Sequence, residues 1–220
     1  MTQTKSSIIY QKIKQDLSEG RLPSGEKLKI SKLKEDYDVS LTPLREALSQ
    51  LAAQGLLDQE TNKGFSVPKL SYSDILDIKQ TRILIETAAL ELSLKNGDME
   101  WEASLVAAHH KLERLSLSVK DLEAWSQAHE NFHSILLSGS DSKYLIQFST
   151  RLNLALDKYR CIAEPNPEIR QKLDEQHSEL LQLALDRNIS QAIETLTSHI
   201  DLSCQSAIEL LKNRDKENIL

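Results

Sequence analysis

Four histidines have a spacing that could bind a metal ion. His129 and His133 are four residues apart, so on a helix both rings lie on one face, an arrangement that commonly supplies two metal ligands. His177 and His199 are each flanked by apolar residues that would turn the ring inward. Buried imidazoles need a polar partner, and a divalent ion is a partner that several of them can share. We therefore expect a divalent ion at these histidines. The alternative is a solvated helix face, where this spacing is also common.

The remaining histidines and the cysteines offer little chemistry. His109 and His110 have no patterned partner, so we expect them on the surface or in the core. Cys161 and Cys204 form no Cys-x-x-Cys motif, which excludes a disulfide scaffold and indicates a reducing compartment. A metal-activated hydrolase is one alternative, because zinc can activate water, although Glu130 is not expected to act as its general base. A purely structural ion is another.

Long helices are expected to position the four histidines. The 220 residues are 40% hydrophobic and 27% charged, which excludes wholesale disorder. Gly and Pro number only 6 and 5, which argues against an all-β chain, and helical periodicity runs from residue 71 almost to the end. No apolar run has the length of a signal peptide or a membrane span, so a soluble cytoplasmic protein without a membrane partner is expected.

A different pattern precedes residue 70. Apolar spacing predicts helices over 6–19, 30–37 and 41–54, with a tight turn at 38–39, which is a helix-turn-helix arrangement. Short strands over 56–59 and 65–67, joined by the turn 61–64, predict a wing. The predicted fold is mainly α, with an N-terminal winged helix-turn-helix domain over 1–69 and a C-terminal all-helical bundle over 70–220.

The charge is unevenly distributed between these two predicted domains. Residues 1–69 carry 11 Lys and Arg against 9 Asp and Glu, whereas the remainder carries 16 against 24. The basic N-terminal part could bind nucleic acid, because neutralisation of phosphates dominates the affinity of proteins for nucleic acid. An excess this small also arises by chance.

The start of the third predicted helix suits contact with DNA. Ser40 and Thr42 would present hydroxyl groups at a helix N-terminus, which favours phosphate, and Arg45 could reach a base or a phosphate. The candidate DNA-contacting residues are Lys29, Ser31, Ser40, Thr42, Arg45, Lys63 and Gly64. The alternative is that Arg45 and Glu46 form a solvated surface pair and that the hairpin only closes a core.

Three motifs resemble the winged-helix domain of GntR-family transcription regulators. They are Leu-Pro-Ser-Gly-Glu-Lys-Leu (22–28), Val-Ser-Leu-Thr-Pro-Leu-Arg-Glu-Ala-Leu (39–48) and Leu-Ala-Ala-Gln-Gly-Leu (51–56). The resemblance implies a regulator that binds double-stranded operator DNA as a homodimer, with repression relieved by a ligand as the family's commoner mode. Two positions depart from the family pattern: Leu41 replaces the usual Arg, and Asp38 replaces the usual Gly in the turn.

The segment 71–212 resembles the all-helical effector domain, called FCD, of the FadR subgroup. That domain has an Asp four residues before a His, then single His residues on two later helices. The resemblance implies that His133, His177 and His199 are metal ligands and that a small organic acid binds there as the effector. His129 stands at the position of the Asp, so the ligand set is softer and a divalent transition metal is expected, Zn²⁺ first and Ni²⁺ as the alternative.

Two arginines are candidates for binding the effector. Arg82 matches a family Arg in the first effector-domain helix, where bidentate pairing suits a carboxylate, and the alternative is an ion pair with Glu86 one turn later. Arg160 is a weaker candidate. The stretches 43–51 and 97–103 look most like carbon-starvation-type regulators, which also have a His where His129 stands. That resemblance implies a short dicarboxylate effector.

Overall fold

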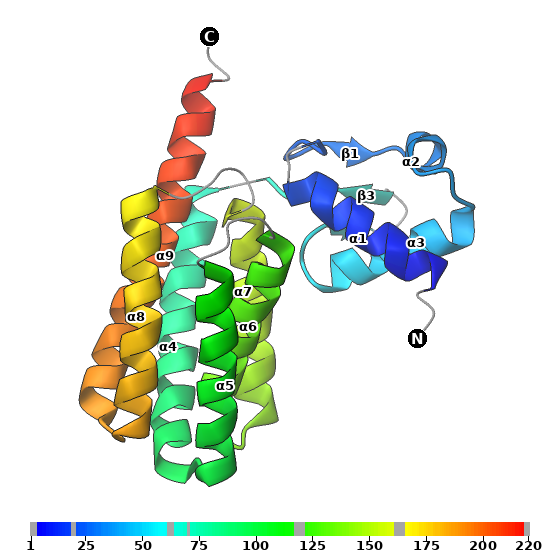
Figure 1. Ribbon diagram of the computed structural model, residues 1–220. Coiled ribbons are helices and arrows are strands. Elements are labelled where there is room, and N and C mark those ends of the chain that lie inside the picture. The colour runs from blue at the N-terminus through cyan, green and yellow to red at the C-terminus, as the bar shows by residue number, and fades with distance from the viewer. Residues whose placement is uncertain are drawn as a thin grey trace. The chain divides into compact units, whose positions relative to one another are not determined.

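The computed structural model describes residues 4–18, 21–60, 64–69, 71–116, 122–160 and 166–217 (Figure 1). Contacts divide the chain into two compact units, one comprising 1–74, 154–164 and 207–220, the other 75–153 and 165–206. The protein is mainly helical, with a small sheet near the N-terminus, and this confirms the predicted fold class. The exact domain boundary at residue 69 stays a prediction.

Three helices belong to the N-terminal winged-helix domain, and the second and third of them form its helix-turn-helix. They are α1 (Lys5–Ser18), α2 (Ile30–Asp36) and α3 (Leu41–Ala53). Asp38 lies in the left-handed region with φ of 50°, which is the conformation that a Gly would adopt at less cost. Ser40 is the N-cap of α3, but its side chain makes no capping hydrogen bond. The Ser40 hydroxyl is therefore not used to begin the helix.

The sheet has three strands, of which the sequence predicted two. Strands β1 (Lys27–Leu28), β2 (Asp58–Glu60) and β3 (Gly64–Ser66) are antiparallel in the order β1-β3-β2. Strand β1 was missed because two residues are too few to show an alternating pattern. The prediction that the first wing strand covers 56–59 was also wrong at its start. Leu56 and Leu57 are both buried, whereas successive strand residues face opposite sides, so the strand begins only at Asp58.

The helix-turn-helix and its sheet share one hydrophobic core. Ile13, Leu44, Leu48 and Leu51 are fully buried there, and Phe65 brings the central strand into the same cluster. These are the positions of α1 and α3 that recur at helical spacing. The core therefore leaves the opposite face of α3 toward solvent.

The rest of the described chain is helical. Its elements are α4 (Tyr72–Asn96), α5 (Met99–Ser116), α6 (Leu122–Ser138), α7 (Lys143–Arg160), α8 (Pro167–Leu185) and α9 (Ile189–Glu217), which Figure 1 shows as long rods. Helix α5 packs against both α6 and α8. Leu105, Phe132, Leu180 and Leu196 are fully buried among these helices. None of the described helices has the length and apolar character that crossing a membrane requires.

Arg187 connects the turn between α8 and α9 to the end of α4. Its guanidinium donates to the carbonyl oxygens of Leu94 and Gly97 at 3.1 and 2.7 Å and pairs with Glu102. The same group lies 4.9 Å from the ring centroid of Trp101. Since the last carbonyl groups of a helix have no partner within it, Arg187 caps α4 from a distant part of the chain.

Candidate metal centre

Three helices bring the four predicted histidine ligands together. Helix α6 supplies His129 and His133 one turn apart, α8 supplies His177 and α9 supplies His199. All four side chains are buried, with exposed fractions of 8, 3, 2 and 1% in that order. Each can place one ring nitrogen within 4.8 Å of those of the other three. The predicted convergence is confirmed, and the solvated-face alternative is wrong.

The distance between two of these rings matches that of ligands to one ion. The Nε2 atoms of His133 and His177 are 3.2 Å apart. Zinc–nitrogen bonds of about 2.0–2.1 Å in a tetrahedral arrangement separate two ligand nitrogens by roughly 3.4 Å. The two Nε2 atoms are within hydrogen-bonding distance of each other, and a single ion could also bridge them at this spacing.

Aromatic side chains surround the histidine cluster. Phe132 contacts His133 and His177 edge-on, with ring centroids 5.4 and 5.5 Å apart. Trp125 stacks on His129 at 5.0 Å with an interplanar angle of 21°. An apolar shell of this kind limits water access and strengthens electrostatic interactions inside it.

The donor set fits a transition metal. Imidazole nitrogens suit Zn²⁺, Ni²⁺ and Cu²⁺, whereas Mg²⁺ and Ca²⁺ prefer oxygen ligands. Within the described residues this group consists of histidines alone, and neutral ligands leave the full charge of the ion uncompensated. The four-histidine cluster can therefore hold a transition metal that attracts an anion.

Residues 129–133 also match the sequence of the metalloprotease motif His-Glu-x-x-His. The Glu in that motif acts as general base beside the zinc. Here Glu130 is exposed and does not belong to the buried cluster, which instead gains two histidines from other helices.

The two other histidines lie outside the cluster, as expected. His109 is buried, its Nε2 atom lies 3.2 Å from the Ser178 hydroxyl, and its ring contacts Phe132 edge-on. Burial lowers the pKa of His109, because desolvation disfavours the charged imidazolium. His110 is exposed.

Arg82 forms the ion pair with Glu86 that was the alternative to binding the carboxylate of an effector. Its side chain is fully buried, and Nε and Nη2 donate to the two carboxylate oxygens of Glu86 at 2.8 and 3.2 Å. Asn153 also donates to Glu86, at 3.2 Å. The effector role of Arg82 stays a prediction. Arg160 ends α7, and its side chain lies outside the described part of the structure.

The predicted DNA-contacting side chains are exposed wherever the structure describes them. Lys29, Ser31, Ser40, Thr42 and Arg45 are all exposed. Gly64 has a φ of +88°, with open space where a side chain would stand. Lys63 lies outside the described residues. Contact of these residues with DNA stays a prediction.

Family models match both parts of the chain. Residues 5–67 match the bacterial regulatory proteins of the gntR family, and residues 77–202 match the FCD domain. The chain belongs to the GntR family. Its FCD domain contains all four histidines of the cluster.

Relatives and solved structures agree with this assignment. The chain is 36% identical over 199 residues to the regulator BphR of Paraburkholderia xenovorans, covering 88% of this chain and 81% of that protein. It is 34% identical over 198 residues to the repressor GlaR of Escherichia coli, covering 87% and 90%. The fold matches E. coli McbR/YncC with a TM-score of 0.72 at 22% identity, over 97% and 100% of the two chains. It also matches a metal-free FCD domain with a TM-score of 0.55, over 66% and 98%.

These relatives are transcription regulators and not enzymes, so this GntR-family protein is a DNA-binding transcription regulator. The hydrolase alternative is wrong. The finer resemblance to carbon-starvation-type regulators stays a prediction.

Sequence reasoning missed the residues that surround the ligands. Trp125 lies one turn before His129, and Asp174 lies three residues before His177. Helical spacing could have indicated both, because residues three or four apart share a face. Nothing in the spacing could have indicated Ser116, which reaches them from another helix.

Proposed function

We propose that this GntR-family regulator is a repressor whose operator affinity is controlled by a small carboxylate at a metal site in the FCD domain. The observation that carries the proposal is the cluster of four buried imidazoles from three helices, all within 4.8 Å of one another. A regulator of operator DNA acts in the cytoplasm, and we expect it to bind as a homodimer.

The chemistry of the cluster favours an anionic effector. Zn²⁺ is the ion we expect, with Ni²⁺ as the alternative, because imidazole nitrogens suit both. Neutral ligands leave the charge of the ion uncompensated in a buried site, so an anion that enters as a fifth ligand would bind strongly. A short dicarboxylate is the proposed effector, and Arg82 and Arg160 are the candidates for its second carboxylate.

The same cluster offers a route from effector to DNA. Because the ligands come from α6, α8 and α9, an effector that alters the coordination would shift these helices relative to one another. In a homodimer this would change the spacing of the two winged helices, which must match the spacing of two half-sites. A coupling of about 1–3 kcal/mol changes operator affinity roughly 5–150-fold.

Operator binding in the presence of organic acids tests the proposal. Fluorescence anisotropy would follow the full-length protein on operator DNA with a panel of dicarboxylates, with zinc or with a chelator. We expect one acid to weaken binding only when zinc is present. If zinc raises the melting temperature but no acid changes operator affinity, the ion is structural and the sensor proposal is wrong.

A matched pair of variants separates the two halves of the function. His133→Ala should remove the effector response while the winged helix still binds DNA. His110→Ala, at an exposed histidine outside the cluster, should retain the response. Equal responses in the two variants would contradict a role for the cluster.

A further inference from the structure

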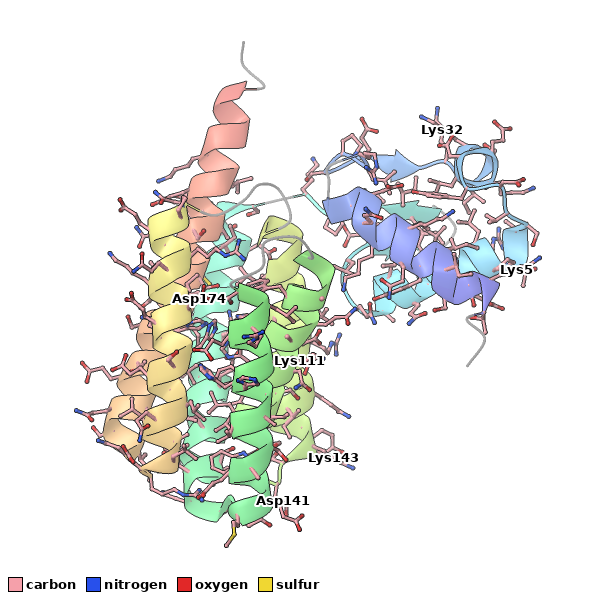
Figure 2. All side chains as sticks on the ribbon, viewed as in Figure 1. Lys5, Lys32, Lys111, Asp141, Lys143 and Asp174 are labelled. Atoms are coloured by element: carbon pink, nitrogen blue, oxygen red, sulfur yellow. The ribbon has the colours of Figure 1, made fainter. Side chains whose placement is uncertain are left out.

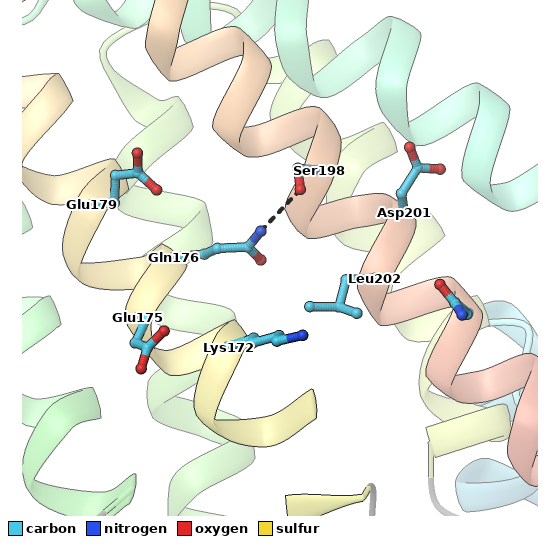
Figure 3. A pocket seen from close by; sticks show the side chains of 8 residues that line it. Lys172, Glu175, Gln176, Glu179, Ser198, Asp201 and Leu202 are labelled. Carbon is cyan, nitrogen blue, oxygen red and sulfur yellow. Dashed lines mark hydrogen bonds between the residues drawn. The ribbon is translucent and has the colours of Figure 1, made fainter. Parts of the chain in front are cut away.

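A chain of side chains runs along the outside of the histidine cluster. The Trp125 indole Nε1 donates to the Ser116 hydroxyl at 3.0 Å, and that hydroxyl donates to Asp174 Oδ1 at 3.1 Å. The same carboxylate oxygen lies 3.8 Å from Nδ1 of His177. Trp125 itself stacks on His129. The three residues come from α5, α6 and α8, and together they link His129 to His177 outside the cluster (Asp174 is labelled in Figure 2).

Helical spacing explains why α8 can do this. Asp174 precedes His177 by three residues, so the carboxylate and the imidazole lie on the same side of the helix. Arg170, one turn earlier, places its guanidinium 5.5 Å from the Trp125 ring centroid. The arrangement holds Trp125 against α8 at the position where its indole N–H reaches Ser116.

The position of the proton on His177 decides whether its Nε2 atom can bind an ion. Nε2 of His177 faces Nε2 of His133 at 3.2 Å, so Nε2 is the nitrogen that would bind an ion. A neutral imidazole carries one proton, and an ion can bind Nε2 only when that proton is on Nδ1. Asp174 lies on the Nδ1 side of the ring, and an anion there favours a proton on the adjacent nitrogen.

We propose that Asp174 is a positioning residue for the metal centre: its carboxylate, held by Ser116, keeps the His177 proton on Nδ1 and the ring oriented so that Nε2 faces the ion. The inference rests on the proposed metal site. A carboxylate near the outer nitrogen of a histidine ligand also raises its basicity, and loss of a hydrogen-bonded partner of this kind typically lowers metal affinity about 10–100-fold. Asp174 lies 3.8 Å from Nδ1, beyond hydrogen-bonding distance, so it acts on the ring through its charge.

Metal affinity of the full-length protein tests this role. Zn²⁺ binding would be measured by competition with a chromophoric chelator for the wild type, Asp174→Ala, Asp174→Asn and Ser116→Ala. We expect Asp174→Ala to weaken Zn²⁺ binding about 10–100-fold. Asp174→Asn should have a smaller effect, because the amide oxygen still accepts the hydrogen bond from Ser116 but carries no charge. Ser116→Ala should also weaken binding, since it releases the carboxylate.

The adjacent residue provides a matched control. Glu175 is exposed on the same helix and accepts a hydrogen bond from Gln171 at 2.8 Å. Glu175→Gln removes the same charge as Asp174→Asn one residue away, so we expect its zinc affinity to equal that of the wild type. An equal loss in both variants would mean that only general charge matters, and it would overturn the proposal.

A spectroscopic measurement distinguishes positioning from folding. The visible absorption of the Co²⁺-loaded protein reports the strength and geometry of the ligands. We expect the bands to shift in Asp174→Ala but not in Glu175→Gln, while circular dichroism of the metal-free proteins stays unchanged.

The two proposals fail in different ways. If the wild type binds zinc and Asp174→Ala binds it equally well with unchanged Co²⁺ bands, the positioning role is wrong and the metal site stands. If the wild type binds neither ion, both proposals are wrong.

Discussion

At the scale of single residues, the four imidazoles differ in their surroundings. His133 and His177 approach each other most closely through their Nε2 atoms and both contact Phe132. His129 has the largest exposed fraction of the four, at 8%, and it stacks on Trp125. Its ring centroid is nevertheless 4.6 Å from that of His133, within the same cluster.

The first prediction concerns His129 as a ligand. His129→Ala should lower zinc affinity, because three imidazoles remain where four were available, whereas His133→Ala should lower it further by removing a less exposed ring whose Nε2 faces that of His177. Zinc content after dialysis and competition titration would measure both. Unchanged affinity in His129→Ala would show that this ring does not bind the ion.

The second prediction uses Trp125 as a reporter. Because the indole stacks on His129, zinc binding at that ring should change the tryptophan fluorescence. Trp125→Phe should abolish this response. Trp101→Phe is the matched control and should retain it, since Trp101 donates instead to the Ile135 carbonyl at 2.7 Å. Retention of the response in Trp125→Phe would contradict the assignment.

At the scale of elements, the junction between α4 and α5 is packed without spare room. A Cβ atom added at Gly97 would lie 2.4 Å from Cε3 of Trp101 and 2.7 Å from the Ser93 carbonyl oxygen. At the same junction, the Arg187 guanidinium donates a hydrogen bond to the carbonyl oxygen of Gly97. A small residue is therefore required here by close approach.

The third prediction follows from that contact. Gly97→Ala should lower the free energy of unfolding by about 1–3 kcal/mol, because an ordered aromatic ring and a helix end must move to make room. Urea denaturation followed by circular dichroism would measure this change. An unchanged unfolding midpoint would contradict the packing argument.

Gly55 is the comparison position for this experiment. It has a φ of +76° and no heavy atom within 4 Å of the added Cβ. Gly55→Ala should therefore cost only the backbone strain of about 1–2 kcal/mol. Gly97→Ala should cost less in a Trp101→Leu background than in the wild type, because the ring that the added Cβ meets is gone, whereas no second substitution would relieve the strain at Gly55.

At the scale of the whole molecule, DNA binding and effector sensing are assigned to different parts of the chain. The residues matching the gntR family carry the exposed polar start of α3, and the FCD domain carries the histidines. A substitution in one part should therefore leave the binding step of the other unchanged. The residue that best tests this separation is Arg45.

The fourth prediction is that Arg45→Ala weakens operator binding without altering zinc affinity. Loss of one phosphate contact should reduce the slope of log affinity against log salt by about 1, and loss of a base contact would relax sequence preference. Anisotropy titrations at several salt concentrations would measure both effects.

A charge-matched control accompanies Arg45. Lys95→Ala removes one positive charge from α4, where Lys95 pairs with Glu91, and should leave the salt slope unchanged. If Arg45→Ala behaved like Lys95→Ala, Arg45 would be a solvated charge with no role in binding DNA.

The sequence predicted much of the fold because the relevant signals are local. Helical spacing of Ile9 and Ile13 indicated the first helix, and both residues are buried in the core together with Leu44 and Leu48 of α3. The motif at 39–48 indicated the helix-turn-helix, and the left-handed Asp38 confirmed that the turn keeps its geometry without Gly. The two-residue strand β1 could not be predicted, because it pairs with β3, far along the chain, and two residues show no alternating pattern.

For the proposed metal centre, the sequence by itself identified the four candidate ligands, since the spacing of His129 and His133 and the apolar flanks of His177 and His199 are properties of single helices. Only the tertiary structure decided that the four rings meet, that Arg82 is paired with Glu86, and that Ser116 and Asp174 stand behind His177. These contacts join residues on different helices or depend on which face is buried. Periodicity along one helix cannot specify such relations, because they depend on how the helices pack against one another.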